Sequence, residues 1–138
     1  GANTRENDNN TLYPVIDLME SQRDVKELGG TLRLGNYTCK LVEGTKVHEL
    51  YGKDEIVERH RHRYEVNNLY RKQLESAGVI VSGVHEELDL VEVIELKNHD
   101  YFVACQFHPE FRNRPNNIHP LFRGFVKASA KSRASKGR

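Results

Sequence analysis

The chain has 138 residues, the size of one domain, of which 37% are hydrophobic and 30% are charged. No apolar run approaches the roughly 20 residues of a membrane span, and no stretch resembles a signal peptide. These features predict a soluble, cytoplasmic protein without a membrane partner. The two cysteines, Cys39 and Cys105, are too few for a disulfide framework and lack the spacing of a redox pair, so we expect reduced, structural thiols.

The formal charge of +1 conceals a basic C-terminal end. After residue 126 there are five basic side chains and no acidic one, which leaves 16 basic and 20 acidic residues before it, a charge of −4. A nucleic-acid-binding arm would combine such charge with aromatic or glycine-rich partners, which this segment lacks. We therefore predict no nucleic-acid partner, a domain over residues 1–130 and a solvated basic tail over residues 131–138.

The first half of the chain predicts a loop followed by a hairpin. Gly1–Thr11 is polar and rich in Asn, which is typical of a loop, and the folded body is expected to begin at Leu12. Thr31–Leu34 and Tyr37–Val42 alternate apolar and polar residues. Because Gly35-Asn36 between them suits a two-residue turn, these segments predict a β-hairpin.

The second half predicts a helix, three strands and a last helix. Asn67 or Asn68 can cap a helix that ends at Gly78 and has apolar residues at i, i+4 and i+7 (Tyr70, Leu74, Ala77). The strands that follow are expected over Val79–Val84, Leu90–Leu96 and Tyr101–Phe107, and their short connections require antiparallel pairing. The last helix is expected to begin at Pro120, with Phe122, Phe125 and Val126 on one face.

An imidazole and a carboxylate stand two residues apart in Gln106–Phe111, at the end of the last predicted strand. Pro109 fixes its own φ and favours an extended His108, so the side chains of His108 and Glu110 are expected on the same side. A carboxylate that holds one ring nitrogen leaves the other free to exchange a proton with a nucleophile. The pattern predicts a catalytic pair; a plain turn at a strand end is the alternative.

The run Arg59–Arg63 alternates arginine and histidine. If it is extended, its arginines lie on one face, and His60 and His62 lie on the other. His-x-His is also a metal-ligand spacing, but zinc needs two more ligands and the other histidines are not paired, so we predict no metal site. A further interpretation is a surface strand whose charge is balanced by Glu58 and Glu65.

Four segments carry a resemblance to a known family. They occur in the order Leu28–Gly35, Glu58–Asn67, Gln106–Phe111 and His119–Phe122. Together they closely resemble the C-terminal part of the glutaminase domain of the CTP synthase family, a class I (triad-type) glutamine amidotransferase domain. The resemblance runs from about Ala2 to about Ala130. It implies an α/β fold, the C-terminal portion of a flavodoxin-like domain, with a mixed sheet containing antiparallel strands and flanking helices.

The resemblance also implies roles for four residues. His108 and Glu110 would be the catalytic pair. Arg63, the arginine directly before the tyrosine of its segment, would bind glutamine, a task that suits a planar guanidinium. Ala2–Glu6 corresponds to a family segment whose glutamate contacts the substrate, so Glu6 is a second candidate for binding glutamine.

The nucleophilic cysteine of the family lies on a strand-to-helix elbow of the type G-x-C-x-G, and this chain has no such segment. Cys39 and Cys105 stand in predicted strands without flanking glycines, as buried structural cysteines do. Cys105 is three residues from His108, but odd and even strand positions face opposite sides, so we expect its thiol to point away from the imidazole. The chain alone is therefore predicted to be inactive.

In such an enzyme a cysteine thiolate attacks the side-chain amide of glutamine, and the histidine protonates the departing ammonia and then activates water against the thioester. The resemblance implies that the ammonia reaches a synthase domain outside this sequence, where ATP and Mg²⁺ support the conversion of UTP to CTP in pyrimidine nucleotide biosynthesis. We expect no cofactor in this chain, which has no phosphate-binding loop, and a homo-oligomeric intact enzyme. Two alternatives stay open: a non-catalytic binding or regulatory module of the same fold, and a separate His/Glu or metal hydrolase.

Overall fold

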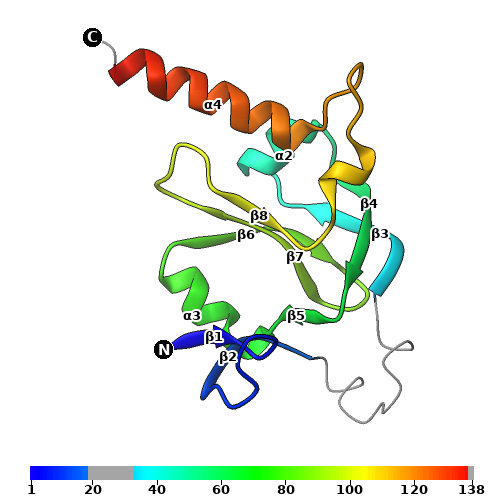
Figure 1. Cartoon of the computed structure of the whole chain (residues 1–138), viewed down its shortest axis with the longest axis vertical. Helices are drawn as coiled ribbons and strands as arrows, with labels where there is room; N and C mark the ends of the chain where they lie inside the picture. The colour runs from blue at the N-terminus through cyan, green and yellow to red at the C-terminus, as the bar shows by residue number, and fades with distance from the viewer. Residues whose placement is uncertain (19–32, 137–138) are drawn as a thin grey trace.

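The structure is a computed structural model, and it describes residues 1–18 and 33–136. The strands in this part of the chain form two sheets (Figure 1). The first has the order β1-β2-β5, with β1 at Ala2–Thr4, β2 at Tyr13–Leu18 and β5 at Tyr64–Val66. The second has the order β4-β3-β6-β7-β8, with β3 at Arg33–Leu41, β4 at Glu55–His62, β6 at Val79–His85, β7 at Leu90–Leu96 and β8 at Val103–Cys105.

The helices lie on two sides of the second sheet. Figure 1 shows α2 (Lys46–Tyr51) and α4 (Pro120–Lys136) together on one side, and α3 (Arg71–Ser76) with β1 and β2 on the other. Two short 3-10 helices, η1 (Asn68–Tyr70) and η2 (Pro109–Arg112), complete the described elements. None of the described helices is long and apolar enough to cross a membrane.

The hydrophobic core lies between the second sheet and the helices α2 and α4. Its buried members come from β3, α2, β4, β7, the segment after β8 and α4: Cys39, Leu41, Val47, Ile56, Val93, Phe107 and Leu121. Burial of such side chains is the main favourable contribution to folding. The core fixes the base of α4 and the end of β8, and so it positions the segment that contains His108.

The structure confirms the mixed α/β fold and most predicted elements of the second half. β1 and β2 pair in parallel, and β6, β7 and β8 are antiparallel neighbours, although the last strand is shorter than predicted. The Asn67 side chain accepts a hydrogen bond from the backbone N–H of Leu69, as a helix cap does. The last helix begins at Pro120 and continues to Lys136, so the basic end is helical as far as that residue.

Two predictions for the first half are wrong, and one helix was not predicted. Gly35 and Asn36 form no turn, because they lie inside β3 and pair with His60 and Arg59 of β4. Side-chain burial alternates without a break along β3, whereas a turn would reverse the chain there. Ala2–Thr4 is a strand rather than loop, and α2 was not predicted, although Thr45 caps its first turn and Gly52 ends it in the left-handed conformation. Residues 28–32, which belong to the motif Leu28–Gly35 and include the start of the predicted strand Thr31–Leu34, lie outside the described residues.

Candidate active site

His108 and Glu110 meet on the segment that follows β8. His108 has an extended backbone (φ −103°, ψ 90°), and Pro109 begins η2 directly after it. Oε1 of Glu110 lies 2.7 Å from Nδ1 of His108, which confirms the predicted contact. This hydrogen bond lowers the pKa of Glu110, so the carboxylate is charged and can orient the ring. Nε2 of His108 has no hydrogen-bond partner among the described residues, and the side chain is 36% exposed.

Two further contacts hold His108 in place. Its backbone N–H donates to the carbonyl oxygen of Arg59 in β4 over 2.9 Å. Its ring stacks on Phe111, with ring centroids 4.7 Å apart and planes inclined by 16°. The backbone hydrogen bond fixes the position of His108 along β4, and the stacking fixes the plane of its ring. The ring is therefore held in one orientation while Nε2 stays accessible.

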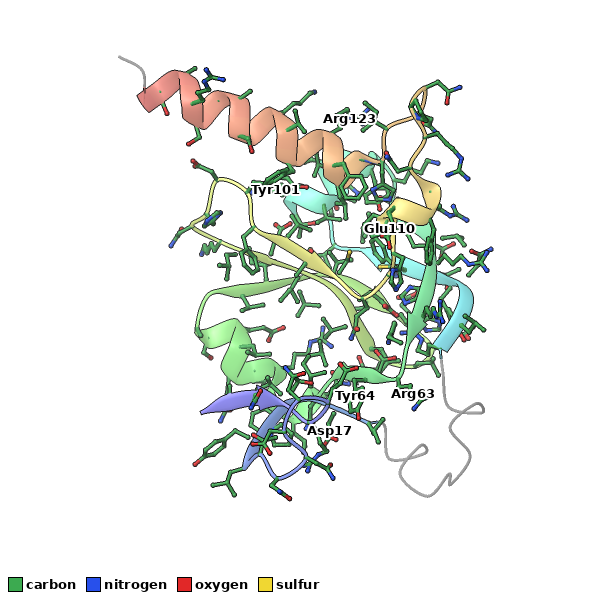
Figure 2. The ribbon with its side chains drawn as sticks, in the orientation of Figure 1. Asp17, Arg63, Tyr64, Tyr101, Glu110 and Arg123 are labelled. Atoms are coloured by element: carbon green, nitrogen blue, oxygen red, sulfur yellow. The ribbon has the colours of Figure 1, made fainter. Side chains whose placement is uncertain are left out.

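Arg63 lies in the bend between β4 and β5 and is half-buried. Figure 2 shows it beside Tyr64 at one end of β4, while Glu110 lies near the other end of that strand. Arg63 is four positions after Arg59, a distance of about 13 Å along an extended chain. The Arg63 guanidinium makes no hydrogen bond or ion pair with the described residues. It is therefore available to an anionic group of a ligand.

Glu6 is exposed in the turn that follows β1. Since β1 runs parallel to β2, the chain leaves β1 at the sheet end where Leu18 of β2 faces Tyr64 of β5. This is the end of the first sheet next to Arg63. Arg5, the residue directly before Glu6, is fixed by an ion pair with Asp17, in which Nε of Arg5 lies 2.8 Å from Oδ1 of Asp17. The fold thus places Glu6 and Arg63 at the same end of one sheet.

Neither cysteine has the surroundings of a nucleophile. Cys39 is fully buried in the core, and Cys105 is partly buried, with its Sγ 3.4 Å from the carbonyl oxygen of Phe107. Desolvation raises the pKa of each thiol to about 12, and the carboxylates of Glu92 and Glu58 act in the same direction. Both thiols are protonated at neutral pH, so the described residues contain no activated cysteine.

The arginine-histidine run is extended from Arg59 to His62, as the alternation predicts, whereas Arg63 lies in the bend that follows. Along β4, Arg59 and Arg61 are exposed while His60 and His62 point inward. The alternative of a surface strand balanced by acidic residues is wrong, because Glu58 is only 3% exposed and Glu65 only 2% exposed. Buried carboxylates of this kind need partners in the interior.

Five side chains next to the bend between β4 and β5 form a closed set of contacts that we call the buried ring: Arg33, His60, His62, Glu65 and Glu92. Nη1 of Arg33 lies 3.3 Å from Oε1 of Glu65, and its Nη2 lies 2.7 Å from Oε1 of Glu92. Nδ1 of His60 lies 3.6 Å from Oε2 of Glu92 and 2.9 Å from Nε2 of His62. The ring closes where Nδ1 of His62 lies 3.4 Å from Oε1 of Glu65.

The two histidines of the buried ring are neutral. Desolvation, reinforced by the nearby charge of Arg33, lowers the pKa of His60 to about 3 and that of His62 to about 4. Nδ1 of His62 lies 3.1 Å from the carbonyl oxygen of Tyr64, which can only accept, so this nitrogen carries the proton. Nε2 of His62 is then an acceptor, and Nδ1 of His60 donates to it.

The buried ring contains imidazole nitrogens and carboxylate oxygens, which are atoms of the kind that bind metal ions. One atom each from His60, His62 and Glu92 lie within 4.8 Å of one another. The lone pair of Nε2 in His62 already accepts a proton from His60, and the guanidinium of Arg33 already neutralises Glu92. A divalent cation would have to displace both contacts beside a fixed positive charge. The arrangement therefore favours a hydrogen-bonded network over a metal centre.

A second buried cluster anchors the start of α4. Oε1 of Glu58 accepts hydrogen bonds from the hydroxyl of Tyr51 at 3.0 Å and from Nε2 of His119 at 3.1 Å. Nδ1 of His119 accepts from the backbone N–H of Leu121 at 3.3 Å. Sequence patterns did not predict this cluster, because its members come from α2, β4 and the segment before α4. It holds the segment after His108 against β4.

Comparison with known proteins agrees with this geometry. The family model for glutamine amidotransferase class-I matches residues 7–128. CTP synthase from Caldanaerobacter subterraneus subsp. tengcongensis is 64% identical over 129 residues, 93% of this chain and 24% of that protein. CTP synthase from Staphylococcus aureus is 54% identical over 136 residues, 99% of this chain and 25% of that protein. The chain thus spans about a quarter of the length of these relatives.

The fold is also that of a solved relative. The structure of the Trypanosoma brucei CTPS glutaminase domain with bound acivicin superimposes with a TM-score of 0.86 at 34% identity, over 94% of this chain and 51% of that one. A Thermoplasma acidophilum protein assigned to GMP synthase has a TM-score of 0.56 at 18% identity, over 78% of this chain and 49% of that one, which shows likeness of fold alone. The chain belongs to the class-I glutamine amidotransferase family, and its similarity is to the glutaminase part of CTP synthases.

Proposed function

We propose that this chain is the acid-base and substrate-binding half of a glutaminase domain that supplies ammonia to a CTP synthase. The observation that carries the proposal is the contact between His108 and Glu110, with Nε2 of His108 unpartnered among the described residues. In a neutral imidazole whose Nδ1–H is held by a carboxylate, Nε2 is the basic nitrogen. That nitrogen can shuttle a proton between a nucleophile, a leaving group and water.

The steps assign one task to each residue. His108 first takes the proton of a cysteine thiol that another part of the protein supplies. The resulting thiolate attacks the side-chain carbonyl carbon of glutamine, and the C–N bond of the tetrahedral intermediate breaks. His108 delivers its proton to the departing nitrogen, which leaves as ammonia, and a thioester remains. His108 then removes a proton from water, which hydrolyses the thioester to glutamate and regenerates the thiolate. Glu110 keeps the imidazole in the required tautomer throughout.

Arg63 and Glu6 would hold the other end of the substrate. The guanidinium of Arg63 has no ion-pair partner among the described residues, so the α-carboxylate of glutamine can take that place. Glu6, at the same end of the first sheet, would accept from the α-ammonium group. A synthase part of the intact enzyme would bind ATP, Mg²⁺ and UTP and would receive the ammonia formed here. The intact enzyme would be a homo-oligomer.

The test is made in the full-length protein that contains this chain. His108→Ala should abolish glutamine-dependent CTP formation, with a loss of at least about a thousandfold, because proton transfer fails in both half-reactions. CTP formation driven by added ammonia should be unchanged, since it needs no glutaminase. If His108→Ala removed both activities equally, His108 would be a structural support of the whole enzyme and the proposal would be wrong.

A further inference from the structure

The carboxylate of Glu65 joins two segments that the proposed function keeps separate. Its Oε1 faces Arg33 and His62 within the buried ring, and its Oε2 accepts a hydrogen bond from Nε2 of Gln106 over 3.3 Å. Glu65 is two residues after Arg63 in the chain, and Gln106 is two residues before His108. One buried side chain therefore contacts His62, directly before the proposed substrate-binding Arg63, and Gln106, two residues before the proposed catalytic His108.

The bend that contains Arg63 is held from its inner side. The hydrogen bond from Nδ1 of His62 to the carbonyl oxygen of Tyr64 closes the bend, and Glu65 follows as the next residue of β5. The remaining nitrogen of the His62 ring is occupied by His60. The contacts of His62 and Glu65 therefore fix the bend on its inner side.

The segment before His108 is held in the same place. The backbone N–H of Gln106 donates to the carbonyl oxygen of Glu92 over 2.9 Å, and the Gln106 side chain reaches Glu65. Gln106 thus contacts two members of the buried ring, one through the backbone and one through the side chain. Since the Arg63 bend and the His108 segment meet at Glu65, a shift of this side chain moves one relative to the other.

We propose that Glu65 is a positioning residue of the glutaminase reaction, which holds the Arg63 bend and the His108 segment at the separation that one bound glutamine requires. The inference rests on the proposed function. Glu65 touches no reacting atom in this account and acts through Gln106 and the buried ring. Displacement of a reacting group by about 1 Å can reduce a rate by two orders of magnitude, so a contact of this kind has kinetic consequences.

The test compares three variants of the full-length protein. Glu65→Gln preserves size but gives the side chain an N–H₂ group that faces a donor on one side, either Arg33 or Gln106. Gln106→Leu removes only the hydrogen bond to Oε2 of Glu65 and leaves the contacts of Oε1 in place. Glu92→Gln is the matched control, because it removes a carboxylate from the same ring and the same arginine, while the Glu92 side chain does not contact that of Gln106.

Glu65→Gln and Gln106→Leu should each lower kcat/KM for glutamine by about tenfold to a hundredfold, through both a higher KM and a lower kcat. The double variant should be no worse than the more impaired single variant, because both changes break one connection. Ammonia-driven CTP formation should be unchanged in all of them. Glu92→Gln should lower the melting temperature as much as Glu65→Gln but change kcat/KM for glutamine by less than about threefold.

Either of two results would overturn the positioning role. One is an unchanged kcat/KM for glutamine in Gln106→Leu, which decides the matter even if Glu65→Gln does not fold. The other is a fall in kcat/KM for glutamine in Glu92→Gln that equals the fall in Glu65→Gln. That result would show that Glu65 acts only by stabilising the buried ring. His108→Ala, measured in the same assay, separates these results from failure of the proposed function, since a His108→Ala enzyme with full glutamine-dependent activity would remove the reaction itself.

Discussion

The backbone N–H of His108 donates to the carbonyl oxygen of Arg59 across 2.9 Å, and this one bond connects opposite edges of the second sheet. β8 and β4 are the two outer strands, and the chain that leaves β8 crosses to β4 at His108. The segment that leaves one edge strand of the sheet therefore reaches the other edge strand within three residues. β4 also leads directly into the bend with Arg63, so the positions of both His108 and Arg63 depend on this one strand.

A polypeptide of these 138 residues should not release ammonia from glutamine. The thiols of Cys39 and Cys105 have pKa values raised to about 12, so neither offers a thiolate at neutral pH, and the His-Glu pair alone provides only general-base assistance. The measurement is ammonia release at pH 8 from purified protein, compared with a Cys105→Ser variant. Release that is abolished in the Cys105→Ser variant would identify Cys105 as a nucleophile and contradict the prediction.

Arg63→Ala in the full-length protein should raise the KM for glutamine by more than about tenfold, with a smaller fall in kcat, because the loss of a charge-assisted contact to substrate costs about 1.5–3 kcal/mol. Ammonia-driven CTP formation should be unaffected. Arg123→Ala is the matched control, since Arg123 is an exposed arginine on α4 (Figure 2). Equal effects of the two substitutions would show that Arg63 acts only through the charge of the protein.

The stability of the fold should depend on pH through the buried histidines. Burial lowers the folded-state pKa of His60 to about 3, so the unfolded state binds more protons between pH 3 and about 6.5, and stability is lost as the pH falls through this range. His62 acts in the same direction. Glu65, whose pKa is raised by burial to about 7, acts in the opposite direction between about pH 4.5 and 7, so the steepest loss is expected below pH 4.5.

The variant that checks this assignment is His60→Gln, measured by urea unfolding of the intact domain at several pH values between 3.5 and 7. The slope of the unfolding free energy against pH should decrease by up to about 1.4 kcal/mol per pH unit, the contribution of one proton. The variant will be less stable than wild type at pH 7, so the slope, and not the absolute stability, is the relevant quantity. An unaltered slope would mean that His60 is protonated in the folded state.

The isolated chain should self-associate or bind apolar dyes. A groove of about 180 Å³ between the two sheets is lined mostly by apolar side chains, among them Ile16, Val66 and Ala104. Leu12 is 83% exposed, and Val126 on α4 is 64% exposed. Apolar grooves and exposed apolar side chains are common at surfaces that another chain or segment covers. Co-expression with the rest of the glutaminase domain should give a soluble complex with lower dye binding, as measured by light scattering and fluorescence; equal dye binding with and without it would contradict the prediction.

Local patterns predicted the parts of this fold whose signals lie close together in the sequence. The cap at Asn67, the antiparallel strands after Gly78 and the contact between His108 and Glu110 all depend on residues a few positions apart. Strand alternation also placed His60 and His62 on the inner face of β4. Glu58 has the same parity as these histidines, so its burial was accessible from the same rule.

The buried ring could not be predicted from local sequence patterns. Arg33 and Glu65 are 32 residues apart and lie on strands of different sheets, and the bend at Arg63 breaks the alternation that would connect β4 to β5. Glu92 is one of two acidic residues in the otherwise apolar strand β7, a position that predicts a partner but does not identify it. Only the three-dimensional pairing of strands brings these charges together.

The exposure of the pair formed by His108 and Glu110 has an electrostatic consequence. In contact with water, the attraction between an imidazolium and a carboxylate is weakened by the high dielectric constant and by dissolved salt. If a further part of the proposed domain covered the pair and excluded solvent, the same 2.7 Å contact would be screened less and would hold the ring more firmly. In the proposed glutaminase, the orientation of the His108 ring would therefore be held most firmly where the part of the domain that supplies the thiol is also present.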